Sequence, residues 1–244
     1  MTDLSINLNK LALLRNSRGR DYPNLVSFAE DFIALGVQGL TILPRQDQRH
    51  ITNKDAINLG ELLSKYPDVE LNIEGYPSSD FLSLVEAIKP DQCSLVPDGP
   101  NQLTSDHGWN LHDDADFELV AKSCGRLNEL GIRSALFMDP ELDQIQRVPA
   151  TGAKRIELYT ETYAASFGSE DQEKVWQLFH QSAVLAQELE IGVNAGHDLD
   201  LNNLGAFLNI PNILEVSIGH ALLIECIERG MNNVIPRYLE LCKI

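Results

Sequence analysis

Two side chains of the sequence are suited to acid–base chemistry near neutral pH. Glu74 directly follows the segment Leu71–Ile73, and His197 follows the small residues Ala195 and Gly196. A carboxylic acid at the end of an apolar segment is expected in a partly enclosed site, where desolvation raises its pKa and suits it to proton transfer. An unperturbed histidine titrates at about pH 6.5. We therefore expect Glu74 and His197 to transfer protons; a salt-bridged glutamate and a structural histidine are the alternatives.

A second group of residues is suited to binding anions. Guanidinium groups match phosphate oxygens in a two-pronged geometry, and four arginines follow the first two apolar segments, namely Arg15, Arg18, Arg45 and Arg49. Gly219 and His220 precede a helix expected from Ala221, so that backbone N–H groups at its positive end would face a ligand. Each arginine could instead pair with one of the 36 acidic residues. Together these residues predict a phosphorylated ligand.

The chain that must position these groups alternates short apolar runs with longer amphipathic segments. This alternation is typical of strand–helix–strand units and a parallel sheet. The expected strands are Leu4–Leu8, Gly39–Ile42, Leu71–Ile73, Gln92–Val96, Arg133–Phe137, Arg155–Leu158, Gly192–Asn194 and Leu214–Ile218. The expected helices are Asn24–Leu35, Lys54–Lys65, Ser79–Ile88, Asp116–Leu130, Leu142–Pro149, Glu173–Leu189, Leu201–Asn209, Ala221–Arg229 and Met231–Cys242.

Eight units of about 30 residues match the size of a closed (β/α)₈ barrel. We therefore predict an α/β protein with the TIM-barrel fold and additional helices, in a single domain that spans residues 1–244. A doubly wound open sheet is the alternative, although no Gly-x-Gly-x-x-Gly follows the first strand. In a barrel the chemistry lies at the carboxyl ends of the strands. We expect the ionisable residues to gather at this rim and the strand interiors to stay apolar.

The composition excludes several classes of partner. The formal net charge of −17 disfavours binding to a phosphate backbone, so no nucleic-acid partner is expected. The apolar stretches are far shorter than the roughly 20 residues that cross a bilayer, and the N-terminus lacks a signal-peptide core. We therefore expect a soluble, cytoplasmic protein with no membrane partner. No His-x-x-x-His or His-Glu-x-x-His pattern occurs, so no metal is expected.

Specific strings then suggest a family. Their residue types and order are similar to those of the pyridoxine 5′-phosphate synthase family, and the resemblance runs through nearly the whole chain. The strings are Asn7–Lys10 with Leu14–Gly19, Arg45–Ile51, Asn72–Glu74, Leu95–Asp98, Val193–His197 and Ile218–Ala221. Any one of them is a weak signal, but six in register are strong evidence of homology.

The resemblance implies a function. The family is a (β/α)₈ barrel that condenses 1-deoxy-D-xylulose 5-phosphate with 3-amino-2-oxopropyl phosphate, closes the pyridine ring of vitamin B6, and releases inorganic phosphate and water. The amine would first form a Schiff base with the sugar ketone, and proton transfers would drive the later steps. The resemblance also implies that no external redox cofactor is needed, that the partners are small phosphorylated substrates, and that the chain forms a homo-oligomer.

The resemblance also implies roles for individual residues. Glu74 matches the family's carboxylate base, His197 its proton donor, and Glu157 a carboxylate that stabilises charged intermediates. The positions that match binding sites for the aminoketone phosphate are Asn7, Arg18, Gly219 and His220. Those that match binding sites for the deoxyxylulose phosphate are Arg45, His50 and Thr104. We add three neighbouring residues to the expected binding site, namely Asn9, Lys10 and Asp198.

The sequence departs from the common family pattern at several of these positions. Leu43 stands where the family has a histidine proton acceptor, and losing one acid–base group costs on the order of 10²–10⁴ in rate. Asn9 and Lys10 replace Asp-His, and Lys10 could substitute as a base if burial or nearby cations lowered its pKa. Asp198 replaces a glycine. Two alternatives therefore stay open: a catalytically silent or attenuated paralogue that binds sugar phosphates or modulates a partner, and another barrel isomerase or aldolase.

Overall fold

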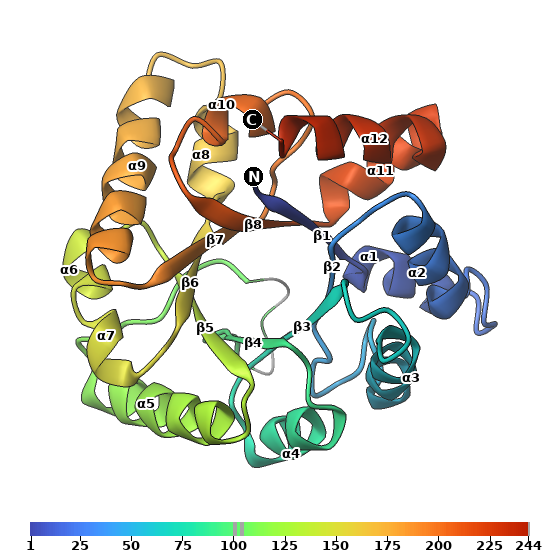
Figure 1. Cartoon of the computed structure of the whole chain (residues 1–244), viewed down its shortest axis with the longest axis horizontal. Coiled ribbons are helices and arrows are strands. Elements are labelled where there is room, and N and C mark those ends of the chain that lie inside the picture. Colours follow the sequence, from blue (N-terminus) through green and yellow to red (C-terminus); the bar gives the residue numbers. More distant parts are fainter. Residues whose placement is uncertain (100–101, 103–104, 244) are drawn as a thin grey trace.

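Eight parallel strands close into a barrel in the computed structural model, which describes residues 1–99, 102 and 105–243. Each strand pairs with the next along the chain, and the last pairs with the first (Figure 1). The strands are β1 (Asp3–Asn7), β2 (Gly39–Ile42), β3 (Glu70–Gly75), β4 (Gln92–Leu95), β5 (Arg133–Met138), β6 (Arg155–Tyr159), β7 (Gly192–Gly196) and β8 (Ile213–Ile218). The predicted (β/α)₈ barrel is therefore confirmed, and every strand was placed to within two residues.

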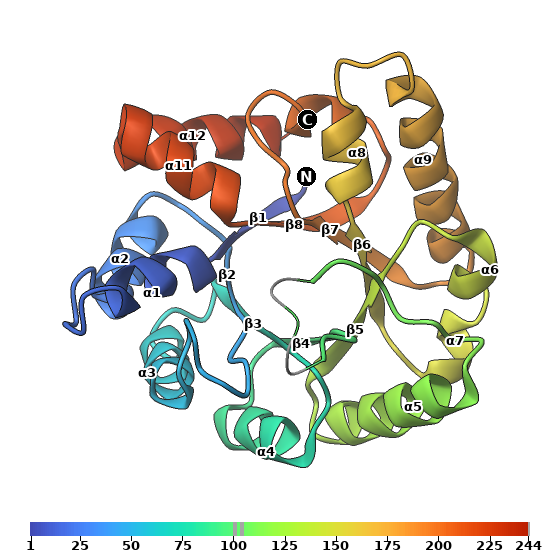
Figure 2. The same ribbon diagram turned by 180° about the vertical axis from the view of Figure 1, so that it is seen from behind.

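The helices form an outer ring around the barrel (Figures 1 and 2). They are α1 (Asn9–Asn16), α2 (Leu25–Ala34), α3 (Asn53–Leu63), α4 (Ser79–Ile88), α5 (Asp114–Glu129), α6 (Leu142–Ile145), α7 (Val148–Thr151), α8 (Glu161–Ser166), α9 (Gln172–Glu188), α10 (Leu204–Phe207), α11 (His220–Arg229) and α12 (Met231–Leu241). Several begin at side-chain caps that accept backbone N–H groups, as Asn24, Thr52, Ser78 and Asp113 do.

Some helices differ from the sequence-based expectation. Helices α1 and α8 were not predicted, because neither begins at a residue whose side chain caps it. The helix expected over 142–149 is divided into α6 and α7, and the one expected over 201–209 is only the single turn α10. Helix α11 begins at His220, one residue earlier than predicted.

The inside of the barrel is polar, contrary to the expectation that the strand interiors are apolar. Ser5 and Thr41 share a hydrogen bond of 2.7 Å, and Asn72 donates to Thr41 at 3.4 Å and accepts from Ser94 at 3.1 Å. Successive side chains of a strand point to opposite faces. The apolar residues that identified the strands are their alternate residues, and these pack against the helices in the main hydrophobic core.

Charged residues also occupy the end of the barrel where the strands begin, so the expectation of a single charged rim is wrong. Arg133 forms an ion pair with Glu70, and Arg155 donates to Asn194 at 3.1 Å and to Glu215 at 3.5 Å. We call these five residues and Gln92, which accepts from both arginines, the base network. It lies opposite the end at which the predicted site residues occur.

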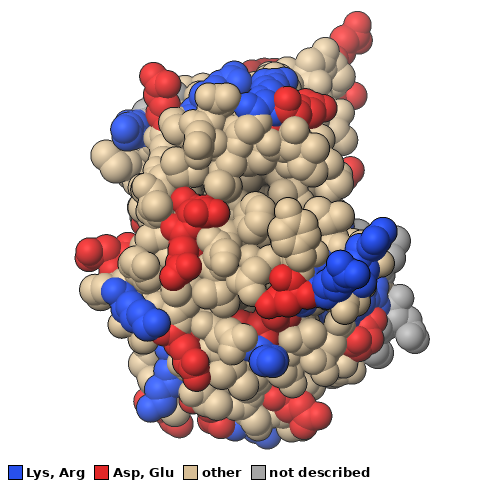
Figure 3. Space-filling model, turned by 90° about the vertical axis from the view of Figure 1, so that its right-hand side faces the viewer, with Lys and Arg blue, Asp and Glu red and all other residues tan. Residues whose placement is uncertain are grey.

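Figure 3 shows the side of the molecule that carries α1, α2, α3, α11 and α12. Charged side chains surround a broad uncharged area on this side. Large apolar side chains are exposed on α1, α3 and α11 and in the loop after α1, namely Leu13, Leu14, Tyr22, Ile57, Ile224 and Ile227. Within the described residues, no helix is long and apolar enough to span a membrane.

Candidate active site

A cavity of about 460 Å³ opens at the carboxyl ends of the barrel strands. We call it the mouth cavity. The expected catalytic and binding residues that line it are Asn7, Asn9, Lys10, Arg45, His50, Glu74, Glu157, His197, Asp198, Gly219 and His220. These residues come from six different strands or the loops that follow them, so that only closure of the barrel brings them together.

Two further residues were predicted to bind substrate, Arg18 and Thr104. Arg18 is exposed in the turn after α1. Its nearness to β1 in the sequence suggested a place at the rim, but the intervening helix, residues 9–16, separates it from the strand end. Thr104 lies outside the described residues.

Glu74 is the more enclosed of the two predicted proton-transfer residues. Its carboxylate is buried near the end of β3 and accepts a hydrogen bond of 3.4 Å from the Asn7 amide. Burial raises its pKa well above the usual range, and the negative charges of Glu157, Asp98 and Glu215 raise it further, whereas Arg45 lowers it. Both effects favour the protonated form of the carboxyl group, and a nearby cation would favour the ionised form.

Glu157 lies buried on β6 and accepts a hydrogen bond of 3.3 Å from Ser94. Burial raises its pKa to about 8, and the charge of Glu215 adds to this increase, whereas the Ser94 hydroxyl lowers it. Gly196 lies close beside it, because a Cβ atom at that position would lie 2.4 Å from Glu157 Oε1 and would displace the carboxylate. The glycine of the Ala-Gly-His string thus makes room for a carboxylate.

His197 completes the group of residues that could transfer protons. Its Nδ1 lies 2.9 Å from Asp198 Oδ2, and its ring packs edge-on against Tyr159 with centroids 4.9 Å apart. Both His197 and Asp198 have positive φ angles, of 90° and 58°, a conformation that costs energy for residues other than glycine. Thr160 donates to the His197 carbonyl and so holds this conformation. The hydrogen bond from His197 lowers the pKa of Asp198, which suits an acceptor that fixes the imidazole orientation.

The loop after β2 supplies cationic and donor groups to the mouth cavity. Arg45 pairs with the buried Asp98, which also accepts from Ser105 at 2.7 Å. The Arg45 Nε atom is buried and has no hydrogen-bond partner among the described residues. Arg49 pairs with Asp47 and also lines the cavity. Pairing of the arginines with carboxylates, the alternative to anion binding, thus holds in part.

His50 on the same loop is neutral at physiological pH. Burial lowers its pKa to about 4, and the positive charges of Arg45, Arg49 and Lys10 act in the same direction. Its Nδ1 accepts a hydrogen bond of 2.9 Å from the backbone N–H of Ile51, so that the neutral ring carries its proton on Nε2. His50 therefore offers the cavity a neutral N–H donor.

Asn9, Lys10 and Asn7 come from the end of β1 and the start of α1. The Asn9 side chain accepts the backbone N–H of Leu43 at 2.8 Å and so holds the end of β2. Lys10 is exposed at the edge of the mouth cavity. A Cβ atom at Gly219 would lie 3.0 Å from the Asn7 Cβ, so that the backbone at the start of α11 closely approaches the end of β1.

Sequence reasoning missed an apolar side of the mouth cavity. Leu43, Val96 and Phe137 line it, and together with Tyr159 they form a hydrophobic cluster separate from the main core. Phe137 and Tyr159 have ring centroids 5.2 Å apart. The signal was present in the alternation of the strands, because each of these residues occupies an inward-facing position at a strand end. Ser105 and Ser217, which also line the cavity, were not predicted either.

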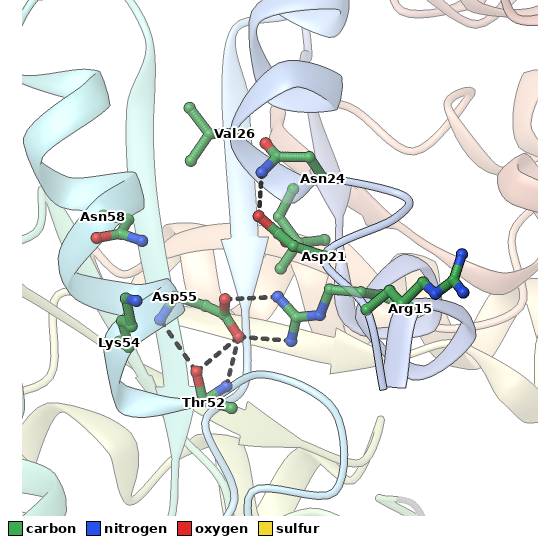
Figure 4. Close-up of a pocket in the computed structure, with 10 residues that line it drawn as sticks. Arg15, Asp21, Asn24, Val26, Thr52, Lys54, Asp55 and Asn58 are labelled. Atoms are coloured by element: carbon green, nitrogen blue, oxygen red, sulfur yellow. Dashed lines mark hydrogen bonds and ion pairs between the residues drawn. The ribbon is translucent and has the colours of Figure 1, made fainter. Parts of the chain in front are cut away.

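A second cavity of about 310 Å³ lies between α1, α2 and α3 (Figure 4). Arg15, Thr52 and Asp55 line it, and Arg15 forms a two-pronged ion pair with Asp55. The expectation that Arg15 lies with the anion-binding residues at the rim is therefore wrong, since Arg15 lines this second cavity and not the mouth cavity. In neither cavity, within the described ranges, are three or more His, Cys, Asp or Glu side chains placed to hold a metal ion.

The sequence is similar to known proteins along nearly its whole length. The family model described as "Pyridoxal phosphate biosynthesis protein PdxJ" matches residues 4–244. A pyridoxine 5′-phosphate synthase of Chelativorans sp. (strain BNC1) is 44% identical over 98% of this chain and 98% of its own. That of Parabacteroides distasonis is 44% identical over the same shares, and that of Leptospira biflexa is 40% identical over 100% of this chain and 98% of its own.

Solved structures of low sequence identity show the fold alone. The phosphoribosyl anthranilate isomerase of Thermotoga maritima superposes with a TM-score of 0.65 at 14% identity, covering 100% of this chain and 99% of that one. A BexX/CysO complex of Amycolatopsis orientalis gives a TM-score of 0.65 at 10% identity, over 99% of this chain and 88% of that one.

Proposed function

The chain belongs to the pyridoxal phosphate biosynthesis protein PdxJ family, and from this premise we propose that it is a pyridoxine 5′-phosphate synthase. It condenses 1-deoxy-D-xylulose 5-phosphate with 3-amino-2-oxopropyl phosphate, forms the pyridine ring, and releases inorganic phosphate and water. The mouth cavity supports this proposal at the level of residues. Glu74, Glu157 and His197 line the same cavity as cationic and N–H donor groups.

In this proposal the acidic groups at the bottom of the cavity favour a cationic reactant. Glu74 and Glu157 are buried, and like charge raises the pKa of each. A protonated amine, or the iminium ion formed when an amine condenses with a ketone, would offset that repulsion and favour ionisation of both Glu74 and Glu157. Glu74 then takes protons from carbon atoms of the bound intermediate, and Glu157 stabilises its positive charge. An aminoketone phosphate is a substrate of this kind.

His197 acts as the acid in this proposal. Asp198 fixes the imidazole through Nδ1, which directs Nε2 away from that partner. A proton delivered from His197 would assist departure of the phosphate or hydroxide leaving group. The phosphoryl groups would be held by Arg45 Nε, by the His50 N–H, and by the backbone around Gly219. Asn7 and His220 contribute from the other side of the cavity.

The direct test mixes purified protein with both substrates and follows pyridoxine 5′-phosphate formation by absorbance and inorganic phosphate release by a coupled assay. We expect the two signals to rise together in equal amounts. The control is Glu74→Gln, which keeps the volume of the side chain but removes the base. Turnover no faster than in this control would overturn the proposal.

Leu43 favours a second candidate, a paralogue that binds phosphate esters without converting them. Its side chain lines the mouth cavity and can neither accept a proton nor form a hydrogen bond. Calorimetry separates the candidates, because this second one predicts that 1-deoxy-D-xylulose 5-phosphate binds while no product forms. Conversion of the bound substrate would exclude it.

We also propose that the chain forms a homo-oligomer through the side shown in Figure 3. Tyr22 in the loop after α1 and Ile227 on α11 are 80% and 67% exposed, and Leu14 on α1 is 50% exposed. Clustered exposed apolar side chains are typical of protein–protein contacts. Light scattering should report a mass above the 27.2 kDa of one chain, and a smaller mass for Ile227→Glu. A wild-type mass equal to that of one chain would contradict this proposal.

The cytoplasmic location of the protein stays a prediction.

A further inference from the structure

We propose that Arg15 is a positioning residue, which through its ion pair with Asp55 and its contact with the His50 carbonyl holds the loop after β2 in the form that binds substrate. We call residues 45–52 of this loop the arginine loop. The proposal rests on the proposed function, since it concerns the affinity of the same cavity for a phosphorylated substrate. Neither Arg15 nor Asp55 lines the mouth cavity, so any effect on catalysis passes through the loop.

The contacts of Arg15 anchor the arginine loop at its end. Its two terminal nitrogens donate to the two Asp55 oxygens at 2.6 and 2.8 Å, and one of them also donates to the His50 carbonyl at 3.3 Å. The Asn16 amide donates to the carbonyls of His50 and Arg49, at 2.8 and 3.0 Å. The last residues of α1 thus fix two successive carbonyls of the loop.

Asp55 ties the same anchor to the start of α3. Thr52 and Asp55 form a capping box, in which Asp55 Oδ2 accepts the Thr52 backbone N–H at 2.8 Å and the Asp55 backbone N–H donates to Thr52 Oγ1 at 3.1 Å (Figure 4). Although burial acts to raise the pKa of Asp55, the hydrogen bonds from Arg15 and Thr52 lower it. The carboxylate is therefore ionised, and the guanidinium is confined between it and the loop.

This anchor determines how His50 and Arg49 face the cavity. Because the His50 carbonyl is held from outside and its Nδ1 accepts the Ile51 N–H, the ring has one orientation, in which Nε2 carries the proton. Arg15 and Asp55 are only 8% and 9% exposed, so water does not compete for the pair. A single-pronged cation in place of Arg15 would leave at least one of these acceptors without its donor.

The test compares Arg15→Lys and Asn16→Ala with a matched control, Arg126→Lys. Arg126 also forms a two-pronged ion pair, with Glu86 between α5 and α4, but far from the arginine loop in the barrel order. For Arg15→Lys we expect the KM for 1-deoxy-D-xylulose 5-phosphate to rise at least tenfold while kcat falls less than about threefold. Asn16→Ala, at an exposed side chain, should raise this KM severalfold. The control should change neither.

A second measurement does not depend on turnover. NMR follows the pH titration of His50 and gives its pKa. We expect this pKa to rise toward 6.5 in Arg15→Lys, because the ring becomes more solvated, and to stay unchanged in Arg126→Lys. If the enzyme lacks synthase activity but His50 titrates as expected, the proposed function fails and the anchor stands. Arg15→Lys and Asn16→Ala could instead lower only the melting temperature and leave the KM and the pKa of His50 as in the wild type. That result would show that Arg15 has no positioning role. Should Arg15→Lys not fold, Asn16→Ala alone decides in the same way.

Discussion

Both ends of the barrel contain buried charges, but the two ends use them differently. In the base network, Arg133 pairs with Glu70, and Arg155 contacts Glu215. At the mouth, Glu74 receives an amide N–H from Asn7 and Glu157 a hydroxyl from Ser94, and within the described residues neither carboxylate forms an ion pair.

The difference indicates which end is built for stability and which for chemistry. A buried carboxylate without a cation lowers the stability of the folded protein, whereas a buried pair compensates part of its desolvation. The contrast is one of degree, because burial raises the pKa of Glu215 to about 7 even though Arg155 lowers it. Glu74, with no cation hydrogen-bonded to it, is the group expected to bind and release protons during a reaction.

The largest expected effect comes from changing the mouth. Glu74→Gln should lower kcat by roughly 10²–10⁴ because it removes the proposed base. It should leave the melting temperature unchanged or higher, since it replaces an ionisable group in a buried site with a neutral one. Steady-state kinetics and calorimetry measure the two quantities on one preparation. A strong loss of stability with little loss of kcat would assign Glu74 to the structure instead.

The opposite change is expected at the base. Arg155→Met should lower the free energy of unfolding by about 3 kcal/mol, because Glu215 and Asn194 lose a buried partner. The kcat should change less than about threefold, since Arg155 does not line the mouth cavity. Urea denaturation gives the stability. A loss of kcat as large as that of Glu74→Gln would show that the two ends are not separate.

The pH dependence of stability sharpens the comparison. Glu157 has a pKa of about 8 in the folded protein and about 4.3 in the unfolded chain. Between about pH 4.3 and 8, the folded protein therefore holds a proton on Glu157 that the unfolded chain has lost. Its contribution to stability is fully present below the unfolded pKa and is lost as pH rises through the folded pKa. The free energy of unfolding should therefore fall between about pH 6.5 and 8.5, by up to about 1.4 kcal/mol per pH unit for this group.

Glu157→Gln should flatten that decrease. Measurements above pH 6.5 avoid a contribution from His50. Because folding lowers the pKa of His50 to about 4, this residue decreases the free energy of unfolding as pH falls from about 6.5 to 4, whereas Glu157 increases it over the same range. Denaturant titrations at several pH values measure the slope. An equal slope in the variant and the wild type would mean that Glu157 does not retain its proton in the folded protein.

The smallest expected effect concerns the apolar side of the mouth. Leu43→His places an acid–base group in the cavity, and we expect kcat to rise about tenfold at a modest cost in stability, because the imidazole lies beside Val96 and Phe137. Leu43→Asn, which is polar but does not titrate, is the matched control. An equal change in both variants would show that polarity alone, and not proton transfer, matters at this position.

The fold could be predicted because its signals are local. Every second residue of a strand points toward the helices, and most of these residues are apolar. The strands were recognised from such residues, for example Leu40, Ile42, Leu71 and Ile73. The site followed from one topological rule, that parallel strands of a barrel end at the same rim. Glu74 and His197 were found in this way although 123 residues separate them in the sequence (197 − 74).

The remainder depends on partners that are distant in the sequence. The residue that pairs with Arg15 lies 40 positions away, and nothing in the local sequence separates Arg15, which is paired and buried, from Arg18, which is exposed. The polar interior of the barrel was missed because residues such as Ser94 and Asn72 have no acid–base chemistry of their own. Their hydrogen bonds join different strands and so leave no local pattern in the sequence. Helix α1 was missed because Leu8 stands where a capping side chain would indicate its start.

The central claim is that one cavity at the mouth of the barrel brings Glu74 and His197 to the same small phosphorylated molecule. The most direct test is a crystal structure of the protein with 1-deoxy-D-xylulose 5-phosphate and inorganic phosphate. We expect both to bind in the mouth cavity, with the sugar carbons between the Glu74 carboxylate and the His197 imidazole and a phosphoryl group near Arg45 and His50. Binding in the second cavity beside Arg15, or binding in which no ligand atom reaches both Glu74 and His197, would contradict it.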